Sequence, residues 1–225
     1  MVSIIIPSYN QQEYLPDAIE SAIAQSVRAE IIVIDDGSTD GSLAKAKEYE
    51  PFGVKVVSQV NKGLASVRNT GIMHATGEYI LPLDADDKIT ENCVERILEV
   101  AEKTDADVIA PSIQCFGLAF ESTILKGDLK LEDFKIGNRI SYCSAIKKSV
   151  LLEVGGYSPR MNEGWEDLHL WYNLLTLGKK FVTIPEPLMW YRIKEQSMWR
   201  DSVKHSEKLW DQIIKDFPQV ASHRK

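Results

Sequence analysis

Short β-branched runs alternate along the first half of the chain with segments of helical periodicity. Four continuous apolar runs have the length of strands: Val2–Ile6, Ile31–Ile34, Val54–Val57 and Tyr79–Leu81. Apolar runs without alternating polar positions are typical of strands that are covered on both faces. Such strands, separated by helices, predict an α/β fold with a mostly parallel central sheet and helices on both faces.

The segments between these strands carry apolar residues on one helical face. They predict helices at Leu15–Ile23, from about residue 41 to Glu50, at Leu64–Ala75 and at Val94–Ala101. Gly71 in the third helix indicates close packing. A further strand is expected around Val108 and Ile109.

The second half of the chain has a less regular pattern. Residues 111–139 carry several glycines and mixed charge, and they are interpreted as loops with short strands. Further on, the pattern predicts a strand at Ile140–Ile146 and a short helix ended by Gly155-Gly156. A helix is expected at 165–177, followed by strands at Phe181–Ile184 and Leu188–Ile193. An amphipathic helix is expected at about 201–217. Without a repeat or long linker, residues 1–225 are expected to form one domain, with a first half of about 1–90 and a second of about 91–200.

Composition and charge narrow the function classes. The formal net charge is -7, whereas proteins that bind nucleic acid usually have a basic surface. Cys93, Cys115 and Cys143 are far apart in sequence and form no metal-type pair, so we interpret them as small, partly buried hydrophobic residues in a reducing compartment. We find no basic, apolar leader and no apolar run of about 20 residues. These features predict a cytoplasmic protein, with peripheral membrane contact left open.

An acidic cluster follows the fourth apolar run. Asp84-Ala85-Asp86-Asp87 places three carboxyl groups at the end of a predicted strand, where open α/β sheets bind ligands. Hard oxygen ligands suit Mg²⁺ or Mn²⁺. The alternative is a turn whose aspartates cap the next helix, and we assign Asp87 to that role.

A second acidic turn, Asp35-Asp36-Gly37-Ser38, follows the second apolar run. Taken alone, it is explained well by turn formation and helix capping. Because it should face the same crevice as Asp84 and Asp86, a role in binding a base or ribose becomes the stronger interpretation.

The chain as a whole resembles family 2 glycosyltransferases with the GT-A fold. The resemblance rests on ordered motifs: Val2–Asn10, Ile34–Asp40, Asn61–Gly71, Gly77–Ile80, Asp84–Asp87, Gly155–Tyr157, Trp165–Asp167 and Trp190–Arg192. Each motif is weak alone, but their order and spacing agree over about residues 1–90 and resume in the second half. The resemblance implies a single GT-A domain that is Rossmann-like, and an enzyme of the hexosyl- or N-acetylhexosaminyl-transferase class.

The resemblance implies roles for residues of the donor half. Pro7, Tyr9 and Asn10 are expected to form the wall against which the nucleotide base packs, and Asp36 is expected to contact the base or ribose. Lys62 and Arg68 are expected to contact the nucleotide. Asp84-Ala85-Asp86 matches the family's DxD motif. Asp86 is expected to ligate the metal directly, with Asp84 nearer the ribose. The implied cofactor is Mn²⁺ or Mg²⁺.

In the second half, Glu166-Asp167 matches the family's acidic pair, and Asp167 falls at the position of the general base. These carboxylates could equally favour the start of a helix, where the dipole stabilises them. We interpret Trp165 as an acceptor-stacking platform and His169 as structural.

Two departures from the family concern the end of the chain. Lys194 stands where many relatives carry a histidine assigned to the metal. A protonated amine cannot ligate a metal, so Lys194 is either a diphosphate contact or a solvated loop lysine. The processive-synthase pattern Gln-x-x-Arg-Trp is absent, because Trp199 precedes Arg200.

The sequence thus predicts an inverting, non-processive transfer from a nucleoside-diphosphate sugar, with UDP expected, to an acceptor hydroxyl on a glycan, a lipid-linked precursor or a protein. Two alternatives remain. One is a nucleotidyltransferase, although the loop after the first strand is not the glycine-rich basic loop of that class. The other is a non-catalytic nucleotide-sugar or carbohydrate-binding module.

Overall fold

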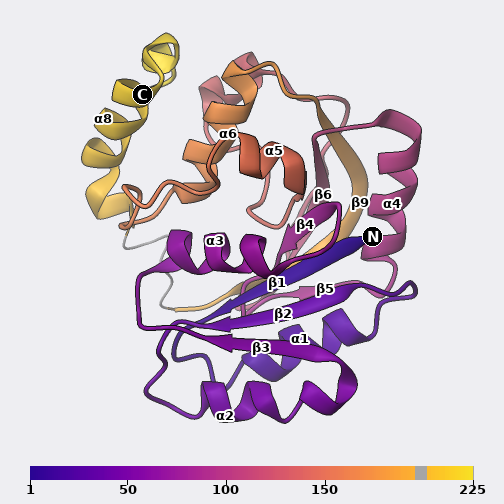
Figure 1. The fold of residues 1–225 in the computed structure, drawn as a ribbon. Helices are drawn as coiled ribbons and strands as arrows, with labels where there is room; N and C mark the ends of the chain where they lie inside the picture. Colours follow the sequence, from indigo (N-terminus) through magenta and orange to yellow (C-terminus); the bar gives the residue numbers. More distant parts are fainter. Residues whose placement is uncertain (196–201, 225) are drawn as a thin grey trace.

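The computed structural model describes residues 1–195 and 202–224, and this part of the chain forms a nine-stranded sheet. The strand order is β3-β2-β1-β4-β8-β6-β9-β5, and β7 pairs with β6 (Figure 1). The strands are β1 (Val2–Ser8), β2 (Glu30–Asp35), β3 (Val54–Ser58), β4 (Tyr79–Pro82), β5 (Lys88–Ile89), β6 (Val108–Gly117), β7 (Ser122–Thr123), β8 (Ala145–Lys147) and β9 (Phe181–Ile193).

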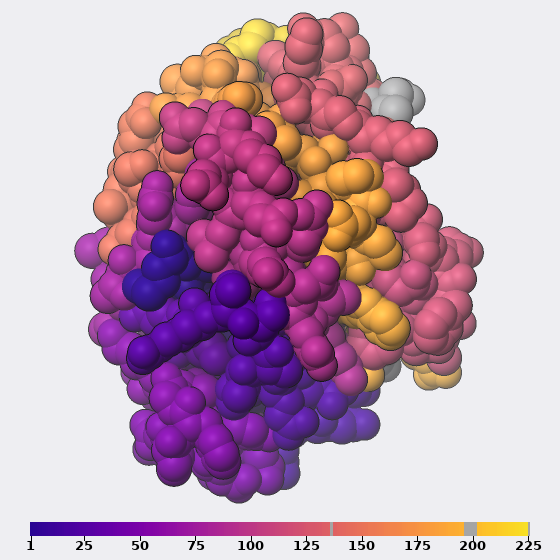
Figure 2. Space-filling view, turned by 90° about the vertical axis from the view of Figure 1, so that its right-hand side faces the viewer, coloured from indigo at the N-terminus to yellow at the C-terminus, as the bar shows by residue number. Residues whose placement is uncertain are grey.

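Helices cover both faces of the sheet, as the apolar runs predict. They are α1 (Leu15–Ile23), α2 (Ser42–Lys47), α3 (Leu64–His74), α4 (Cys93–Thr104), α5 (Lys148–Glu153), α6 (Glu166–Thr176) and α8 (Ser206–Asp216), with 3₁₀ turns at Glu50–Phe52, Leu131–Ile136, Val203–His205 and Pro218–His223. Figure 1 shows α3, α5 and α6 on one side of the sheet and α1 and α2 on the other. The view in Figure 2 shows β9 between α4 and the segment that follows β6.

Alternate residues of β1 supply the two cores. Ile5 packs in the cluster that contains residues of α3, α5 and α6, whereas Ile4 and Ile6 pack in the cluster that contains residues of α1 and α4. Burying one such side chain stabilises the fold by about 1.5–3 kcal/mol. A Cβ at Gly71 of α3 would lie 2.3 Å from Cγ2 of Ile5, so the close packing predicted for this glycine is confirmed.

The sheet reverses its order at β1, which pairs in parallel with β2 on one side and with β4 on the other. Ligands of open α/β sheets bind beside such a switch point, at the carboxyl ends of the strands. Ser8 at the end of β1 is level with Asp35 of β2, and Asp84 follows β4 directly. The fold therefore brings the two acidic turns to one edge, as predicted.

The second half differs from the sequence prediction in three places. Of the expected strand Ile140–Ile146, only Ala145 and Ile146 are in a strand, β8, which continues to Lys147. The residues before it turn, with the Ser144 hydroxyl donating to the Ser141 carbonyl (2.8 Å). A buried apolar segment can satisfy its polar groups in this way without joining a ladder.

The other two differences concern β6 and β9. β6 continues to Gly117, into residues interpreted as loops with short strands, because it pairs in parallel with β9 along its length. The two strands expected over 181–193 form the single strand β9, with an irregularity opposite Ser112 where Pro187 lies. A bulge accommodates a proline that cannot donate to the ladder.

The C-terminal helix α8 packs onto its own domain, with Leu209 and Ile213 buried in the same core as α6. Within residues 1–195 and 202–224, we find no helix with the length and apolar character needed to cross a bilayer. The predicted limits at about 201–217 include residue 201, which lies outside the described residues, as do Trp199 and Arg200. All three cysteines are free thiols.

Candidate active site

A cavity of about 940 Å³ opens along the carboxyl edge of the sheet. Its walls come from the ends of β1, β4 and β9, from α3, and from the start of α6. The sequence-predicted residues that line it are Pro7, Tyr9, Asp36, Arg68, Asp84, Ala85, Asp86, Trp165, Glu166, Asp167 and Lys194. Asn10 and Lys62 are the predicted residues outside this lining.

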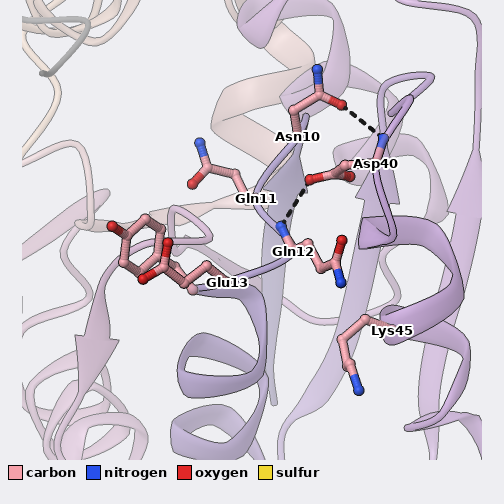
Figure 3. Close-up of a pocket in the computed structure, with 7 residues that line it drawn as sticks. Asn10, Gln11, Gln12, Glu13, Asp40 and Lys45 are labelled. Atoms are coloured by element: carbon pink, nitrogen blue, oxygen red, sulfur yellow. Dashed lines mark hydrogen bonds between the residues drawn. The ribbon is translucent and has the colours of Figure 1, made fainter.

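Asn10 joins the loop after β1 to the loop after β2 rather than facing the main cavity. Its backbone has a φ of 53°, in the left-handed region, which is uncommon for a residue other than glycine. Its side-chain oxygen accepts from the backbone N–H of Thr39 (2.8 Å) and of Asp40 (3.4 Å). Figure 3 shows the contact with Asp40, and the bond from the Gln12 N–H to the Asp40 carboxylate (3.1 Å).

Asp36 is buried and organises the loop that leads into α3. Its carboxylate accepts hydrogen bonds from the Gln59 side chain (2.7 Å) and from the backbone N–H of Lys62 (3.0 Å) and Gly63 (2.8 Å). Lys62 thus contributes its backbone, and its side chain is exposed. Asp36 still faces the cavity, which leaves it in position to meet a nucleoside.

The two carboxylates of the DxD are each paired with a cation of the chain. Asp84 binds the Arg68 guanidinium at 2.8 Å, and Asp86 binds the Lys194 ammonium at 2.5 Å. Burial raises the pKa of Asp84 to about 6, and Arg68 opposes that shift.

Arg68 lines the cavity and links its two acidic motifs. Its side chain is 1% exposed, and it pairs with Glu166 as well as Asp84. The guanidinium lies 5.0 Å from the ring centroid of Tyr142 and 5.3 Å from that of Tyr157. A planar cation with several donors suits such a site. The structure therefore gives Arg68 contacts within the protein, where the sequence resemblance implies a nucleotide contact.

The acidic pair begins helix α6 on a constrained backbone. Trp165, directly before the helix, has a φ of 60°, and a Cβ at Gly164 would lie 2.7 Å from Cβ of Ser202. Non-glycine residues in the left-handed region are held there by their surroundings and are frequent at active sites. This geometry points Asp167 into the cavity while Glu166 turns to Arg68.

Asp167 is held by two hydrogen bonds. Its carboxylate accepts from the Asn138 side chain at 3.0 Å and from its neighbour Leu168 N–H at 2.7 Å. Burial raises its pKa above the ordinary range of an aspartate, while the bond from Asn138 acts in the opposite direction. Burial also raises the pKa of Glu166, and Arg68 opposes the shift.

Asp87 is a structural carboxylate, but it does not cap a helix as the sequence suggests. It precedes β5, and α4 begins only at Cys93. The Asp87 carboxylate accepts from the Tyr142 hydroxyl (2.5 Å) and from the Arg192 N–H (2.6 Å). Tyr142 in turn accepts from the Asp84 N–H (3.1 Å).

Sequence reasoning missed Tyr142 and Asn138. Tyr142 lies in an apolar segment that resembles a core strand, and Asn138 lies in a loop with no periodic pattern. Neither position carries a spacing signal, because their partners are distant in sequence.

Trp165 connects the cavity to the C-terminal helix. Its indole N–H donates to the Ser202 hydroxyl (3.1 Å), and its ring meets that of Trp210 edge to face, with centroids 5.9 Å apart. His169 bonds the Asp216 carboxylate at 2.9 Å. This contact gives His169 the structural role predicted for it.

In this arrangement both carboxylates of the DxD are engaged by cations of the chain. Among residues 1–195 and 202–224, no group of three His, Cys, Asp or Glu side chains is arranged to hold a metal ion. Asp86 offers one carboxylate, and the ammonium of Lys194 already occupies an oxygen of it.

The fold and cavity define an α/β protein with an acidic cavity at the carboxyl ends of its parallel strands. The chain matches the sequence model of Glycosyl transferase family 2 over residues 3–155. It is 30% identical over 223 residues to the glycosyltransferase GlyG of Streptococcus pneumoniae serotype 4, covering 89% of this chain and 73% of that protein. The chain therefore belongs to glycosyl transferase family 2 and is a glycosyltransferase.

Further relatives and structures agree with this family. The putative teichuronic acid biosynthesis glycosyltransferase TuaG of Bacillus subtilis is 28% identical, covering 93% of this chain and 86% of that protein. Some relatives are longer, and the chain covers 33% of GlyA from Streptococcus pneumoniae.

Solved structures share the fold. The structure of Staphylococcus aureus TarS in complex with UDP-GlcNAc has a TM-score of 0.79 at 19% identity, covering 93% of this chain and 63% of that one. The mannosyltransferase PcManGT from Pyrobaculum calidifontis, in complex with GDP-Man and Mn²⁺, has a TM-score of 0.75 at 18% identity, covering 95% and 64%. The predicted GT-A fold is thus confirmed.

Proposed function

We propose that this chain transfers one sugar per encounter from a nucleoside-diphosphate sugar, with UDP as the nucleotide, to an acceptor hydroxyl, with inversion at the anomeric carbon. The observation that carries the proposal is the separation of two acidic sites within one cavity. Asp36, Asp84 and Asp86 lie at strand ends, and Asp167 faces the cavity from the start of α6. UDP and UDP-GlcNAc are bound in structures of TarS, which supports a UDP-sugar donor.

Asp167 acts as the general base. As the acceptor oxygen forms a bond to the anomeric carbon, its proton passes to the Asp167 carboxylate. The bond from that carbon to the diphosphate breaks on the opposite face, and the electron pair leaves on the phosphate oxygen. Burial raises the pKa of Asp167, which makes it a stronger base than an exposed aspartate.

Glu166 supports this step rather than reacting itself. Its carboxylate is buried against Arg68, so it holds the guanidinium that also binds Asp84. With a single carboxylate free to meet the acceptor, one displacement and inversion follow. A retaining double displacement needs a nucleophile beside the anomeric carbon, and the pairing of Glu166 withdraws it from that role.

The donor and the acceptor occupy opposite ends of the cavity. Pro7 and Tyr9 form the wall for the base, with Asn10 bracing their loop, and Asp36 accepts from the nucleoside. Tyr9 is 48% exposed, which leaves its ring available for stacking. Trp165 lies beside Asp167 and offers an apolar surface to the acceptor sugar.

The proposed transfer is derived without a divalent cation. Mn²⁺ accompanies GDP-Man in the PcManGT structure, which favours Mn²⁺ or Mg²⁺ as the cofactor. The pairing of Asp86 with Lys194 argues against it, and we derive no step through a metal. The acceptor classes remain a glycan, a lipid-linked precursor or a protein, and the proposed location is the cytoplasm or its membrane face.

A donor panel tests the proposal. We expect the protein to release a nucleoside diphosphate from one nucleotide sugar. In Asp167→Asn, kcat should fall by about 10²–10⁴ with donor binding retained, because the mutation removes only proton transfer. Release of pyrophosphate from a nucleoside triphosphate and a sugar phosphate would instead identify a nucleotidyltransferase. Donor binding without turnover by the unmutated protein would identify a binding module.

A further inference from the structure

We propose that Lys194 is a built-in counter-charge for the donor diphosphate, so that this glycosyltransferase binds its donor without a divalent cation. The inference rests on the proposed function and specifies how the same site neutralises the leaving group. The observation behind it is the ion pair between Lys194 and Asp86.

Lys194 is held in place at the mouth of the cavity. Its ammonium lies 2.5 Å from the Asp86 carboxylate and 4.8 Å from the ring centroid of Tyr14. Its side chain is 21% exposed, and that of Asp86 is 24% exposed. A lysine in a solvated loop has no such partners, so the structure favours the diphosphate contact over that alternative.

The backbone before Lys194 is also fixed. Arg192 donates to the Asp86 carbonyl (2.7 Å) and to the Asp17 carboxylate (2.7 Å), and its guanidinium lies 4.4 Å from the ring centroid of Phe116. These contacts tie the end of β9 to the acidic loop. Lys194 therefore reaches Asp86 from an anchored strand end.

Each carboxylate of the acidic loop has a partner within the protein. Asp84 pairs with Arg68, Asp86 pairs with Lys194, and Asp87 bonds Tyr142 and Arg192. Mg²⁺ and similar ions usually need one or two carboxylates in addition to substrate phosphates. An incoming ion would have to displace the ammonium from Asp86, and the remaining carboxylates are already engaged.

The ammonium can perform the electrostatic part of the metal's task. It has three donors, and the bond to Asp86 leaves donors for phosphate oxygens. A fixed positive charge beside the leaving diphosphate stabilises the negative charge that develops there, at no cost of reorganisation during the reaction. The lysine ammonium is a compact point charge, so it can stabilise the negative charge of a phosphate group.

Calorimetric binding of UDP, GDP, CDP and dTDP tests the inference, each with EDTA and with Mn²⁺. For the nucleotide that binds, the unmutated protein should show affinities that agree within about threefold in the two conditions. Lys194→Met should weaken binding in EDTA by about tenfold or more, because a charged contact with phosphate is lost. Binding of the corresponding nucleoside, which has no phosphate, should not change.

Matched variants separate this role from a general effect of charge. Lys88→Met removes a nearby lysine that pairs with Asp17 and lies outside the cavity lining, and it should bind like the unmutated protein. Lys194→Arg should keep binding in EDTA, and Lys194→His should gain affinity when Mn²⁺ is added.

Two results would overturn the inference. One is binding by the unmutated protein that disappears in EDTA and returns with Mn²⁺, and the other is Lys194→Met binding that equals that of the unmutated protein in EDTA. Both leave the proposed function intact. If none of the nucleotides binds in either condition, the proposed function fails, and the inference fails with it.

Discussion

At the scale of single residues, Asn138 offers a test of the general base. Its side chain donates to the Asp167 carboxylate and so lowers a pKa that burial raises. In Asn138→Ala the pKa of Asp167 should rise further, and the base is active only when ionised. The acid limb of the kcat/KM profile should therefore move to higher pH, by roughly 1 unit for the loss of a hydrogen bond to a charged group.

The control for this prediction is Asn162→Ala, which changes an asparagine that lines the same cavity. Its acid limb should coincide with that of the unmutated protein. A lower kcat in Asn138→Ala with an unshifted limb would mean that Asn138 only shapes the cavity, and that the titrating group is not Asp167.

Replacement of Arg68 should lower the free energy of unfolding more than replacement of a surface arginine. Arg68→Met leaves Glu166 and Asp84 without their buried cation, and breaking a buried ion pair typically costs about 3–5 kcal/mol. Arg96→Met removes a partly exposed pair with Glu186, and such surface pairs contribute about 0–1 kcal/mol. Urea unfolding of the two variants measures the difference, and equal losses would show that Arg68 acts as a surface arginine does.

Arg68 and Glu166 also show why sequence reasoning reached only part of the site. Both residues were selected by motif, yet they are 98 positions apart and meet only in the fold. The sequence predicts a nucleotide contact for Arg68 and a catalytic role for Glu166. In the structure the two side chains form an ion pair with each other. Motifs identify residue types at strand ends, whereas partners across the sheet depend on tertiary packing.

At the scale of elements, Gly71 of α3 packs closely against Ile5 of β1. Gly71→Ala would place a Cβ 2.3 Å from Cγ2 of Ile5, against a strand that is paired on both sides. Overpacking costs about 1–3 kcal/mol, and the gain in helix propensity offsets up to about 1 kcal/mol. We expect a net loss of roughly 1–2 kcal/mol in the free energy of unfolding.

Two further variants check the cause of that loss. Met73→Ala changes an exposed residue of the same helix (71% exposed) and should alter stability by less than about 0.5 kcal/mol. In the double variant Gly71→Ala with Ile5→Ala, the two losses should not add, because the second change removes the atoms that clash. Additive losses would contradict the contact.

Helices and strands could be predicted from the sequence where the apolar pattern alone sets their limits. β1 to β4 and α1, α3 and α4 follow directly from period and run length, although β4 pairs with β1 across 77 positions of the chain. The full length of β6 and the continuity of β9 do not follow in this way, because their long parallel pairing joins segments about 70 residues apart and overrides the glycine and prolines within them. The turn before β8 escaped prediction because its buried serines satisfy one another locally.

At the scale of the whole molecule, one apolar core runs from the first strand to the last helix. It contains Ile5 of β1, Ile72 of α3, Leu170 of α6 and Ile213 of α8. This core therefore joins elements of the expected donor half to elements of the expected acceptor half. The domain limits themselves stay a prediction.

This continuity predicts a single cooperative unfolding transition. Far-ultraviolet circular dichroism reports all helices, whereas tryptophan fluorescence includes the contact of Trp165 with Trp210 between α6 and α8. In urea the two signals should give the same midpoint and the same slope, as two-state behaviour requires. If the fluorescence changed first, α8 would be a separately docked element, and its contacts with Trp165 and His169 would not belong to the core that positions Asp167.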